Sequence, residues 1–249
     1  MKEFVIKVLY NEKVSQNYYL LKLLTKDFKN VVPGQFVEVL CRKENETDPY
    51  LRRPFSIMDI EKDSTSLLYK IVGRGTENLT HLRKNDYLSI LGPLGKGFNI
   101  NLDSKTDNVL VVSGGTGLAP VFYLIKKLKE MKVKYTFLYG IKSKKELPEN
   151  ILNNIEARII FEDTHGLVTD YLSKLEQYTR CYTCGPVEMI RTVYKKLHRY
   201  IFFIEVSLEE RMGCGFGVCY ACPVERRDGK GYYRVCKDGP VFNAREIVL

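Results

Sequence analysis

The stretch "NVLVVSGGTGLAPVFYLIKKLKEMK", residues 108–132, decides the fold of the second half of this chain. Its first part, residues 108–114, is a continuous apolar run, as expected for a β-strand buried on both faces of a sheet. Its last part, residues 118–132, repeats apolar residues at helical spacing. The glycines between the two parts therefore lie in a tight turn from a strand into a helix, which begins an α/β unit.

The same alternation of strands and helices continues downstream. Further strands are predicted at 134–140, 157–163, 178–185 and 200–206, and further helices at 144–154, 167–177 and 187–199. A strand–helix alternation of this kind predicts a parallel sheet with right-handed crossovers. After Val206 the regular pattern stops.

The first hundred residues or so follow a different pattern, with short β-rich runs separated by turn residues. These runs occupy residues 3–10, 18–25, 34–41, 52–60, 66–73 and 86–92. Six closely spaced strands predict a small closed antiparallel β-barrel. One short helix is predicted at 76–82, with Thr76 as its N-cap.

A length of 249 residues accommodates two domains and a small third module. The pattern predicts an α+β multidomain chain with a barrel at 1–102, an α/β domain at 103–206 and a cysteine-rich module at 207–249. No run of eighteen apolar residues occurs, and the first residues lack the apolar core of a signal peptide. We therefore expect a cytoplasmic protein that does not bind membranes.

The formal net charge of +9 raises the question of nucleic-acid binding. Lysine and arginine are scattered along the chain, however, and no motif of a nucleic-acid-binding module accompanies them. We expect no nucleic-acid partner. A basic surface of this kind attracts anionic nucleotides or an acidic protein.

Four of the seven cysteines crowd into one segment near the C-terminus, with the spacing Cys214-x4-Cys219-x2-Cys222-x13-Cys236. In a reducing compartment such a cluster indicates metal ligation rather than disulfides. C-x4-C-x2-C with a distal cysteine is the plant-type [2Fe–2S] ligand pattern, whereas zinc sites usually combine two close pairs. The sequence favours a [2Fe–2S] cluster, with structural zinc as the alternative. The other cysteines lie in predicted strands and are not expected to be ligands: Cys41, Cys181 and Cys184.

Two glycine-containing turns have the composition of anion sites. In the first, Gly114 to Gly117 would let a pyrophosphate approach backbone N–H groups at the start of a helix. In the second, "VGRGTENL" (72–79), the N–H groups of Gly75 and Thr76 would be the donors. Each segment also has a purely structural explanation: a tight turn that needs glycine for the first, and a Thr-capped helix for the second.

Two further segments are weaker signals on their own. "RPFS" (53–56) offers a guanidinium, an aromatic ring and a hydroxyl within one strand, but it equally fits an ordinary strand. "TCGPVEMI" (183–190) follows the fourth parallel strand, at the sheet edge where ligands bind, so Cys184 would face a nucleotide. A buried, inert cysteine is the alternative.

The order of these elements resembles the ferredoxin–NADP reductase superfamily over roughly residues 1–206. The resemblance implies that the barrel holds FAD, with Arg53 on its pyrophosphate and Ser56 near flavin N5, and that the α/β domain holds NAD(H). The flavin residues that it implies are Arg53, Pro54, Phe55, Ser56, Ile71, Gly73, Gly75 and Thr76. The nicotinamide-side residues are Gly114, Gly115, Thr116, Gly117, Cys184, Gly185 and Pro186. Phe55 departs from the tyrosine usual in that superfamily, so a hydroxyl hydrogen bond is lost.

The tail, with "CGFGVCYAC" and "VCKDGPVF", resembles the electron-transfer subunits of NAD-dependent dihydroorotate dehydrogenases, and this resemblance covers essentially the whole chain. It implies an oxidoreductase subunit of pyrimidine biosynthesis, with electrons passing from an FMN-containing partner to the cluster, to FAD and to NAD⁺. It also implies a heterotetramer with two copies of each subunit, and no catalytic acid or base in this chain. Ser143, Lys144 and Lys145 could hold a 2′-phosphate, but the resemblance implies NAD(H).

Two other classes of function remain open on the sequence. One is the NAD(P)H-binding FAD/[2Fe–2S] subunit of another redox complex, such as a sulfhydrogenase or an electron-bifurcating ferredoxin reductase. The other is a non-enzymatic nucleotide-binding module with structural zinc, which predicts a colourless protein. The exposed apolar residues expected beside the ligands, Phe216, Val218 and Tyr220, are either docking contacts or packing for the cysteine loop.

Overall fold

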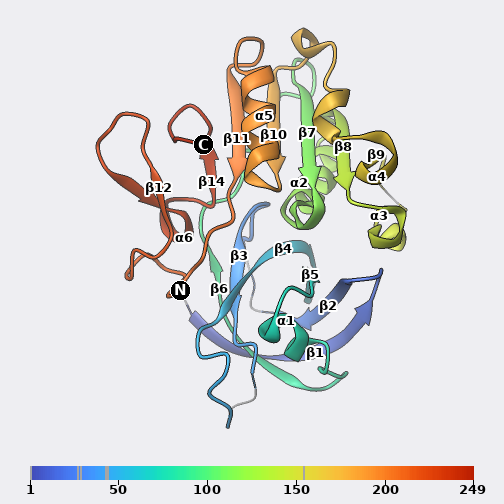
Figure 1. Cartoon of the computed structure of the whole chain (residues 1–249). Helices are drawn as coiled ribbons and strands as arrows, with labels where there is room; N and C mark the ends of the chain where they lie inside the picture. The colour runs from blue at the N-terminus through green and yellow to red at the C-terminus, as the bar shows by residue number, and fades with distance from the viewer. Residues whose placement is uncertain (1, 27, 29, 43–44, 154) are drawn as a thin grey trace.

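The computed structural model describes residues 2–26, 28, 30–42, 45–153 and 155–249. Its first half is a closed barrel of antiparallel strands in the order β1-β2-β5-β4-β3-β6 (Figure 1), which confirms the prediction from the short β-rich runs. The strands are β1 (Lys2–Lys13), β2 (Tyr18–Leu24), β3 (Phe36–Val39), β4 (Arg53–Glu61), β5 (Ser64–Lys70) and β6 (Tyr87–Leu94). Alternate side chains such as Ile6 and Val8 of β1 fill the barrel interior, because successive residues of a strand point to opposite faces.

The short helix of the barrel domain, α1 (Arg74–Leu79), begins two residues earlier than predicted. Its N-cap is Gly73, so the prediction of Thr76 as N-cap is wrong. Thr76 is the third helical residue, and its hydroxyl oxygen accepts hydrogen bonds from the N–H groups of Val72 (2.9 Å) and Gly73 (3.2 Å). The Thr76 side chain therefore accepts hydrogen bonds from the backbone N–H groups that precede the helix, as the third residue of a capping box does.

The second half contains the predicted parallel sheet, with the strand order β14-β11-β10-β7-β8-β9. Five strands are parallel: β7 (Asn108–Gly114), β8 (Lys134–Ile141), β9 (Arg158–Phe161), β10 (Arg180–Cys184) and β11 (Phe203–Ser207). Helix α2 (Leu118–Glu130) packs on the face that carries Val109 and Val111. Helix α5 (Val187–Leu197) packs on the opposite face, against Leu110 and Val112, so β7 is buried on both sides.

Two of the predicted helices are much shorter in the structure. Residues 144–153 form the 3₁₀ turn η2 (Lys144–Glu146) and the single-turn helix α3 (Glu149–Leu152), and Asn154 lies outside the described residues. Pro148 separates the two, since proline lacks an N–H and disfavours helical conformation in the residue before it. Residues 167–177 form two 3₁₀ turns, η3 (Val168–Tyr171) and η4 (Leu175–Gln177), separated by Lys174 at a φ of 49°. A one-turn helix, α4 (Glu162–His165), follows β9 and ends that strand earlier than predicted.

Regular structure continues beyond Val206, contrary to the sequence pattern. The tail forms a hairpin of β12 (Pro223–Glu225) and β13 (Tyr232–Arg234), then the short helix α6 (Val235–Asp238) and β14 (Val241–Asn243). Strand β14 pairs antiparallel with β11 and becomes the outer strand of the large sheet. Among the described residues, no helix is both long and apolar enough to cross a membrane.

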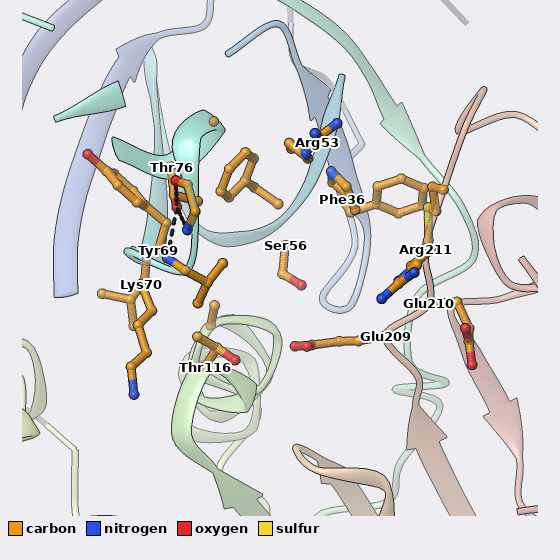
Figure 2. Close-up of a pocket in the computed structure, with 18 of the residues that line it drawn as sticks. Phe36, Arg53, Ser56, Tyr69, Lys70, Thr76, Thr116, Glu209, Glu210 and Arg211 are labelled. Atoms are coloured by element: carbon orange, nitrogen blue, oxygen red, sulfur yellow. Dashed lines mark hydrogen bonds between the residues drawn. The ribbon is translucent and has the colours of Figure 1, made fainter. Parts of the chain in front are cut away.

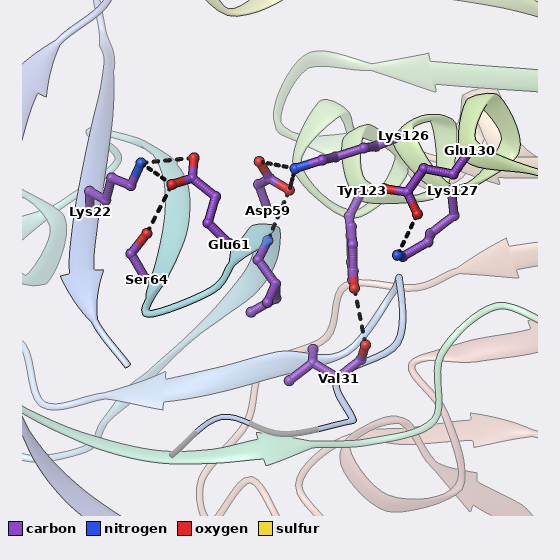
Figure 3. Close-up of polar contacts among 10 residues, drawn as sticks. Lys22, Val31, Asp59, Glu61, Ser64, Tyr123, Lys126, Lys127 and Glu130 are labelled. Atoms are coloured by element: carbon purple, nitrogen blue, oxygen red, sulfur yellow. Dashed lines mark hydrogen bonds and ion pairs between the residues drawn. The ribbon is translucent and has the colours of Figure 1, made fainter. Parts of the chain in front are cut away.

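The barrel and the sheet domain meet along α2, which packs against β4 (Figure 3). Lys126 on α2 lies 2.9 Å and 3.0 Å from the two carboxylate oxygens of Asp59 on β4. The Tyr123 hydroxyl donates a hydrogen bond of 3.3 Å to the carbonyl of Val31, and its ring joins the core of the barrel. The helix that follows the glycine turn is therefore attached to both domains.

Candidate functional site

A cavity of about 710 Å³ lies between the barrel and the sheet domain (Figure 2). Its walls come from β4, the end of β5, the start of α1, the glycine turn before α2 and the segment 207–212 that follows β11. A cavity of this volume lies within the range of ligand and cofactor sites. It is open to the ends of the parallel strands, where ligands bind in α/β sheets.

The structure brings most of the predicted flavin residues to this cavity. Arg53, Pro54, Phe55, Ser56, Gly73, Gly75 and Thr76 line it, whereas Ile71 does not. The Arg53 guanidinium donates to the backbone carbonyls of Leu51 (2.8 Å) and Arg52 (3.1 Å), and no ion pair with a carboxylate is seen for it in the described part of the chain. A guanidinium that carbonyls hold in place and that forms no ion pair with a carboxylate in this part of the chain suits a phosphate ligand.

Gly75 and Phe55 also fit a flat cofactor in this place. A Cβ atom on Gly75 would lie 3.3 Å from Cys41 Cβ and 3.5 Å from Arg53 Cγ, so glycine keeps the wall beside Arg53 open. The Phe55 ring packs edge-on against Tyr69 with a centroid distance of 6.0 Å. The residues present therefore fit a bound FAD, although Phe55 contributes no hydroxyl.

The two nicotinamide-side segments meet at the carboxyl ends of β7 and β10. A Cβ atom on Gly117 would overlap the carbonyl oxygen of Cys184, and one on Gly185 would lie 2.9 Å from the backbone nitrogen of Gly114. These glycines are needed because the backbones of the two turns touch. Of the predicted set, Thr116 lines the cavity, and the others do not: Gly114, Gly115, Gly117, Cys184, Gly185 and Pro186.

The thiol of Cys184 does not border the cavity. Its residue is 1% exposed, and burial raises its pKa, while the Ser207 hydroxyl hydrogen-bonds to it. Ser207 is the neighbour of Cys184 in the β10–β11 ladder and lines the cavity. Contact between Cys184 and a nucleotide stays a prediction.

The segment 207–212 contains none of the predicted site residues, yet it forms one wall of the cavity. Figure 2 shows Glu209 extending into the cavity between Ser56 and Thr116. Glu209 is exposed to the open cavity, yet desolvation by the cavity wall raises the pKa of its carboxyl, and a hydrogen bond with the Thr116 side chain opposes this shift. The position of Glu209 directly after the last parallel strand was the available signal, because that sheet edge is where ligands bind.

The four clustered cysteines lie in a loop whose backbone N–H groups point at sulfur. The N–H groups of Val218 and Cys219 lie 3.3 Å and 3.5 Å from Cys214 Sγ. Partial burial opposes ionisation, but the backbone N–H groups of residues 216, 218 and 219 lower the pKa of Cys214 to about 6. Such donors favour the thiolate form, which is the form that ligates metals.

The sulfur atoms are arranged in two pairs. Cys214 interacts with Cys219, and Cys222 with Cys236, whose N–H donates to Cys222 Sγ at 3.4 Å. A zinc ion needs its donors around one centre, whereas a [2Fe–2S] cluster spreads four thiolates over two irons. The arrangement therefore fits the binuclear cluster better than zinc.

The cysteine loop packs against the barrel and also reaches the surface. A Cβ atom on Gly215 would collide with the buried Glu38 side chain of β3, so glycine is required at this contact. On the outer side, Val218 and Tyr220 are 69% and 60% exposed, and the Arg234 guanidinium lies 4.9 Å from the Tyr220 ring centroid. The loop thus lies between the barrel and an exposed apolar surface.

Comparison with known proteins places these features in a family. Residues 209–248 match the family model described as the iron–sulfur cluster binding domain of dihydroorotate dehydrogenase B. The match confirms the predicted iron–sulfur cluster in this segment, while the assignment of the four cysteines as its ligands stays a prediction. The chain is 36% identical over 250 residues to the dihydroorotate dehydrogenase B (NAD(+)) electron transfer subunit of Caldanaerobacter subterraneus subsp. tengcongensis, covering 98% of this chain and 97% of that protein. It is 37% identical over 253 residues to the protein of the same name from Clostridium acetobutylicum, covering 100% and 98%.

A solved structure of an NADH-dependent reduced ferredoxin–NADP oxidoreductase, studied for flavin-based electron bifurcation, superposes with a TM-score of 0.83 at 26% identity. That match covers 98% of this chain and 90% of the other. The fold match confirms the predicted fold class, a barrel followed by a parallel-sheet domain. On sequence identity and coverage, this chain belongs to the family of electron transfer subunits of dihydroorotate dehydrogenase B.

Proposed function

We propose that this chain relays electrons between a partner subunit that oxidises dihydroorotate and NAD⁺. In this proposal FAD lies in the barrel cavity, NAD(H) on the glycine turn, and a [2Fe–2S] cluster on Cys214, Cys219, Cys222 and Cys236. One observation carries it: the segment 207–212 lines the cavity and continues directly into the cysteine loop. One continuous segment therefore joins the wall of the flavin cavity to the cluster loop.

The three groups divide the chemistry between them. Nicotinamide accepts two electrons as a hydride, a cluster carries one electron at a time, and a flavin exchanges either, so the flavin belongs between the other two. The chain would supply binding and orientation. Arg53, Ser56 and Thr116 line the cavity, where Arg53 would pair with phosphate and Ser56 would contact the flavin ring. Thr116 and its neighbouring glycines would hold the dinucleotide. Packing of α2 against both domains fixes the two nucleotide sites relative to each other.

The partner in this proposal is an FMN-containing dihydroorotate dehydrogenase catalytic subunit, assembled as two copies of each chain, in pyrimidine biosynthesis. The exposed apolar surface beside the cysteine loop is a suitable place for it. Four thiolate ligands require a reducing compartment, so we also propose a cytoplasmic location. We assign the barrel to residues 1–102, the nucleotide domain to 103–206 and the cluster module to 207–249.

Reconstitution with the partner tests the proposal. The chain is co-expressed with the FMN-containing catalytic subunit of the same organism, and NAD⁺ reduction is followed after adding dihydroorotate. We expect dihydroorotate-dependent NADH formation, one FAD and two iron atoms per chain, and a much lower rate with NADP⁺. A colourless protein containing zinc instead of iron would disprove the proposal.

The structural similarity to the ferredoxin–NADP oxidoreductase favours a second candidate, in which reduced ferredoxin or another redox complex is the electron partner. The same preparation distinguishes the two. NAD⁺ reduction with reduced ferredoxin, but not with dihydroorotate and the catalytic subunit, would support the second candidate.

A further inference from the structure

The cysteine loop and the helix that carries Cys236 are separate elements, and one side chain joins them. Arg234 is the last residue of β13 and directly precedes α6, which contains that cysteine. Its guanidinium nitrogen Nη1 donates hydrogen bonds to the carbonyl of Gly217 (3.0 Å) and to the Tyr220 hydroxyl (3.3 Å). Arg234 therefore holds the loop at two points, one on either side of Cys219.

The other side of the same guanidinium is fixed by Asp238, the last residue of α6. Nε and Nη2 of Arg234 lie 3.0 Å and 3.4 Å from the two carboxylate oxygens, and the backbone N–H of Arg234 donates to the same carboxylate at 2.8 Å. The Arg234 side chain is only 19% exposed. Arginine can bridge the helix and the loop because its planar guanidinium presents donors in a fixed fork, which the single ammonium group of lysine does not reproduce.

The segment 217–220, between the two points that the guanidinium holds, carries N–H groups that point at sulfur. Those of Val218 and Cys219 lie 3.3 Å and 3.5 Å from Cys214 Sγ. The segment ends at Tyr220, whose φ of 57° is unfavourable for a bulky residue, so contacts from outside the segment are needed to keep this shape. The direction of the N–H groups toward sulfur therefore depends on the contacts of the guanidinium.

The guanidinium also brings a positive charge to the second pair of cysteines. It attracts the Cys236 thiolate, and the backbone N–H of Gly217 hydrogen-bonds to the same sulfur. Hydrogen bonds to sulfur and nearby positive charge both stabilise the negative charge that an iron–sulfur cluster gains on reduction. Because Asp238 neutralises much of the guanidinium charge, the larger effect belongs to the hydrogen bonds that the held segment makes.

We infer that Arg234 is a positioning residue that raises the reduction potential of the [2Fe–2S] cluster, by holding the segment 217–220 with its N–H groups toward sulfur. This inference rests on the proposed function, in which the four clustered cysteines hold the cluster. A higher potential makes the cluster a better acceptor for electrons from a partner subunit. Arg234 thus favours the entry of electrons into this chain.

The hairpin of β12 and β13 offers a matched control. Arg226 forms an ion pair with Asp228, and its guanidinium lies 4.7 Å from the ring centroid of Tyr233, much as Arg234 lies 4.9 Å from a tyrosine ring. The hydrogen bonds of the Arg226 side chain go to Asp228, and none reaches the cysteine loop in the part of the chain that the structure describes. Arg226→Gln therefore removes the same charge and the same kinds of contact without loosening the loop.

The experiment uses the full chain with its cluster, purified without oxygen, as wild type, Arg234→Gln, Arg234→Lys and Arg226→Gln. The cluster potential is measured by redox titration with mediator dyes, followed through the electron paramagnetic resonance signal of the reduced cluster. For Arg234→Gln we expect the equilibrium constant for one-electron reduction to fall by about tenfold, equivalent to about 59 mV. Arg234→Lys keeps the charge but not the fork, so it should recover only a small part of this shift, and Arg226→Gln should match wild type.

A second readout reports the hydrogen bonds themselves. The protons of N–H groups near sulfur exchange with deuterium, and electron–nuclear double resonance in H₂O and D₂O measures their couplings to the reduced cluster. We expect weaker couplings from exchangeable protons in Arg234→Gln and Arg234→Lys, and unchanged couplings in Arg226→Gln.

Three outcomes would overturn the inference. The first is an unchanged potential in Arg234→Gln. The second is full recovery of the potential in Arg234→Lys, because the charge alone would then set it. The third is an equal shift in Arg226→Gln, which would make the effect one of surface charge. If Arg234→Gln binds no iron, the potential and the couplings of Arg234→Lys decide. If wild type holds no [2Fe–2S] cluster, the proposed function fails rather than this assignment.

Discussion

Lys70, the last residue of β5, lies 2.7 Å from the carboxylate of Glu146, the last residue of the turn that follows β8. The pair joins the barrel to the nucleotide domain beside the glycine turn. Ser15 strengthens the junction by donating a hydrogen bond of 2.8 Å to the Glu146 carbonyl. Lys70 also lines the cavity, and its Nζ lies 5.4 Å from the ring centroid of Tyr18.

Replacing Lys70 with methionine should weaken NAD(H) binding. The lysine ends β5, a strand that contacts the glycine turn, and it lines the cavity, so a dinucleotide diphosphate there would gain a charge-assisted contact with it. We expect a rise in Kd of about 10-fold, measured by titration of the FAD-loaded protein. Asp59→Asn is the matched control, because the Asp59–Lys126 pair joins the same two domains away from the glycine turn (Figure 3). An equal loss of NAD(H) affinity in both variants would show that the Lys70 substitution acts by weakening the contact between the two domains, not by removing a contact with the diphosphate.

Replacing Gly117 with alanine should disrupt the contact between α2 and the end of β10. The added Cβ would overlap the Cys184 carbonyl, which is backbone and cannot rotate aside. We expect a loss of about 2–3 kcal/mol in the free energy of unfolding, measured by denaturant unfolding. In Gly114→Ala the new atom would meet the flexible Met189 side chain at 2.9 Å, so the loss should be clearly smaller. Equal losses would argue against the backbone contact as the cause.

Stability should depend on pH through Glu205. Burial raises the pKa of its carboxyl to about 7, although the Asn99 N–H donates to it at 2.8 Å. Since the folded-state pKa lies above the unfolded value, the folded state binds more protons, and stability is lost as pH rises from about 4.5 to 7. Glu205→Gln removes this loss, so the variant should be more stable than wild type by about 1–3 kcal/mol at pH 8 and nearly equal at pH 4.5. A difference that does not change with pH would contradict this account.

Replacing Cys219 with serine should remove the iron–sulfur cluster and leave FAD bound. The change deletes one thiolate of the Cys214–Cys219 pair, while the flavin residues lie on other elements. Iron content and the visible spectrum measure the cluster, and flavin released on denaturation measures FAD. Cys181→Ala, in the middle of β10, should keep both cofactors. Retention of iron in Cys219→Ser would refute the ligand assignment.

Much of the architecture follows from local patterns. Alternating residues such as Ile6 and Val8 predict the barrel strands, and the apolar run of β7 with the helical spacing of α2 predicts the strand–turn–helix unit. The helices at 144–154 and 167–177 could not be predicted correctly, because Pro148 and the left-handed Lys174 end them after about one turn. The helical spacing of apolar residues alone does not reveal such backbone constraints at single residues.

The residues of the candidate site likewise include some that local sequence patterns predict and some that they do not. Arg53, Ser56 and Thr116 belong to recognisable motifs, and the structure places all three on one cavity. Glu209 belongs to no motif, and its position depends on the path of an irregular segment across the cavity. Strand β14 was missed for a related reason, because three residues are too few to show a period, and their pairing with β11 depends on contacts distant in sequence.

The pairing of β14 with β11 has a consequence for the speed of electron transfer. A cluster carried on a flexible tether would have to swing toward the flavin for each electron, and its rate would fall as solvent viscosity rises. Here the tail returns after Cys236 and hydrogen-bonds into the sheet that carries the glycine turn, while the cysteine loop rests on the barrel at Glu38. The tunnelling distance is therefore set by the folded chain itself, and glycerol should slow docking of the partner without slowing the internal step.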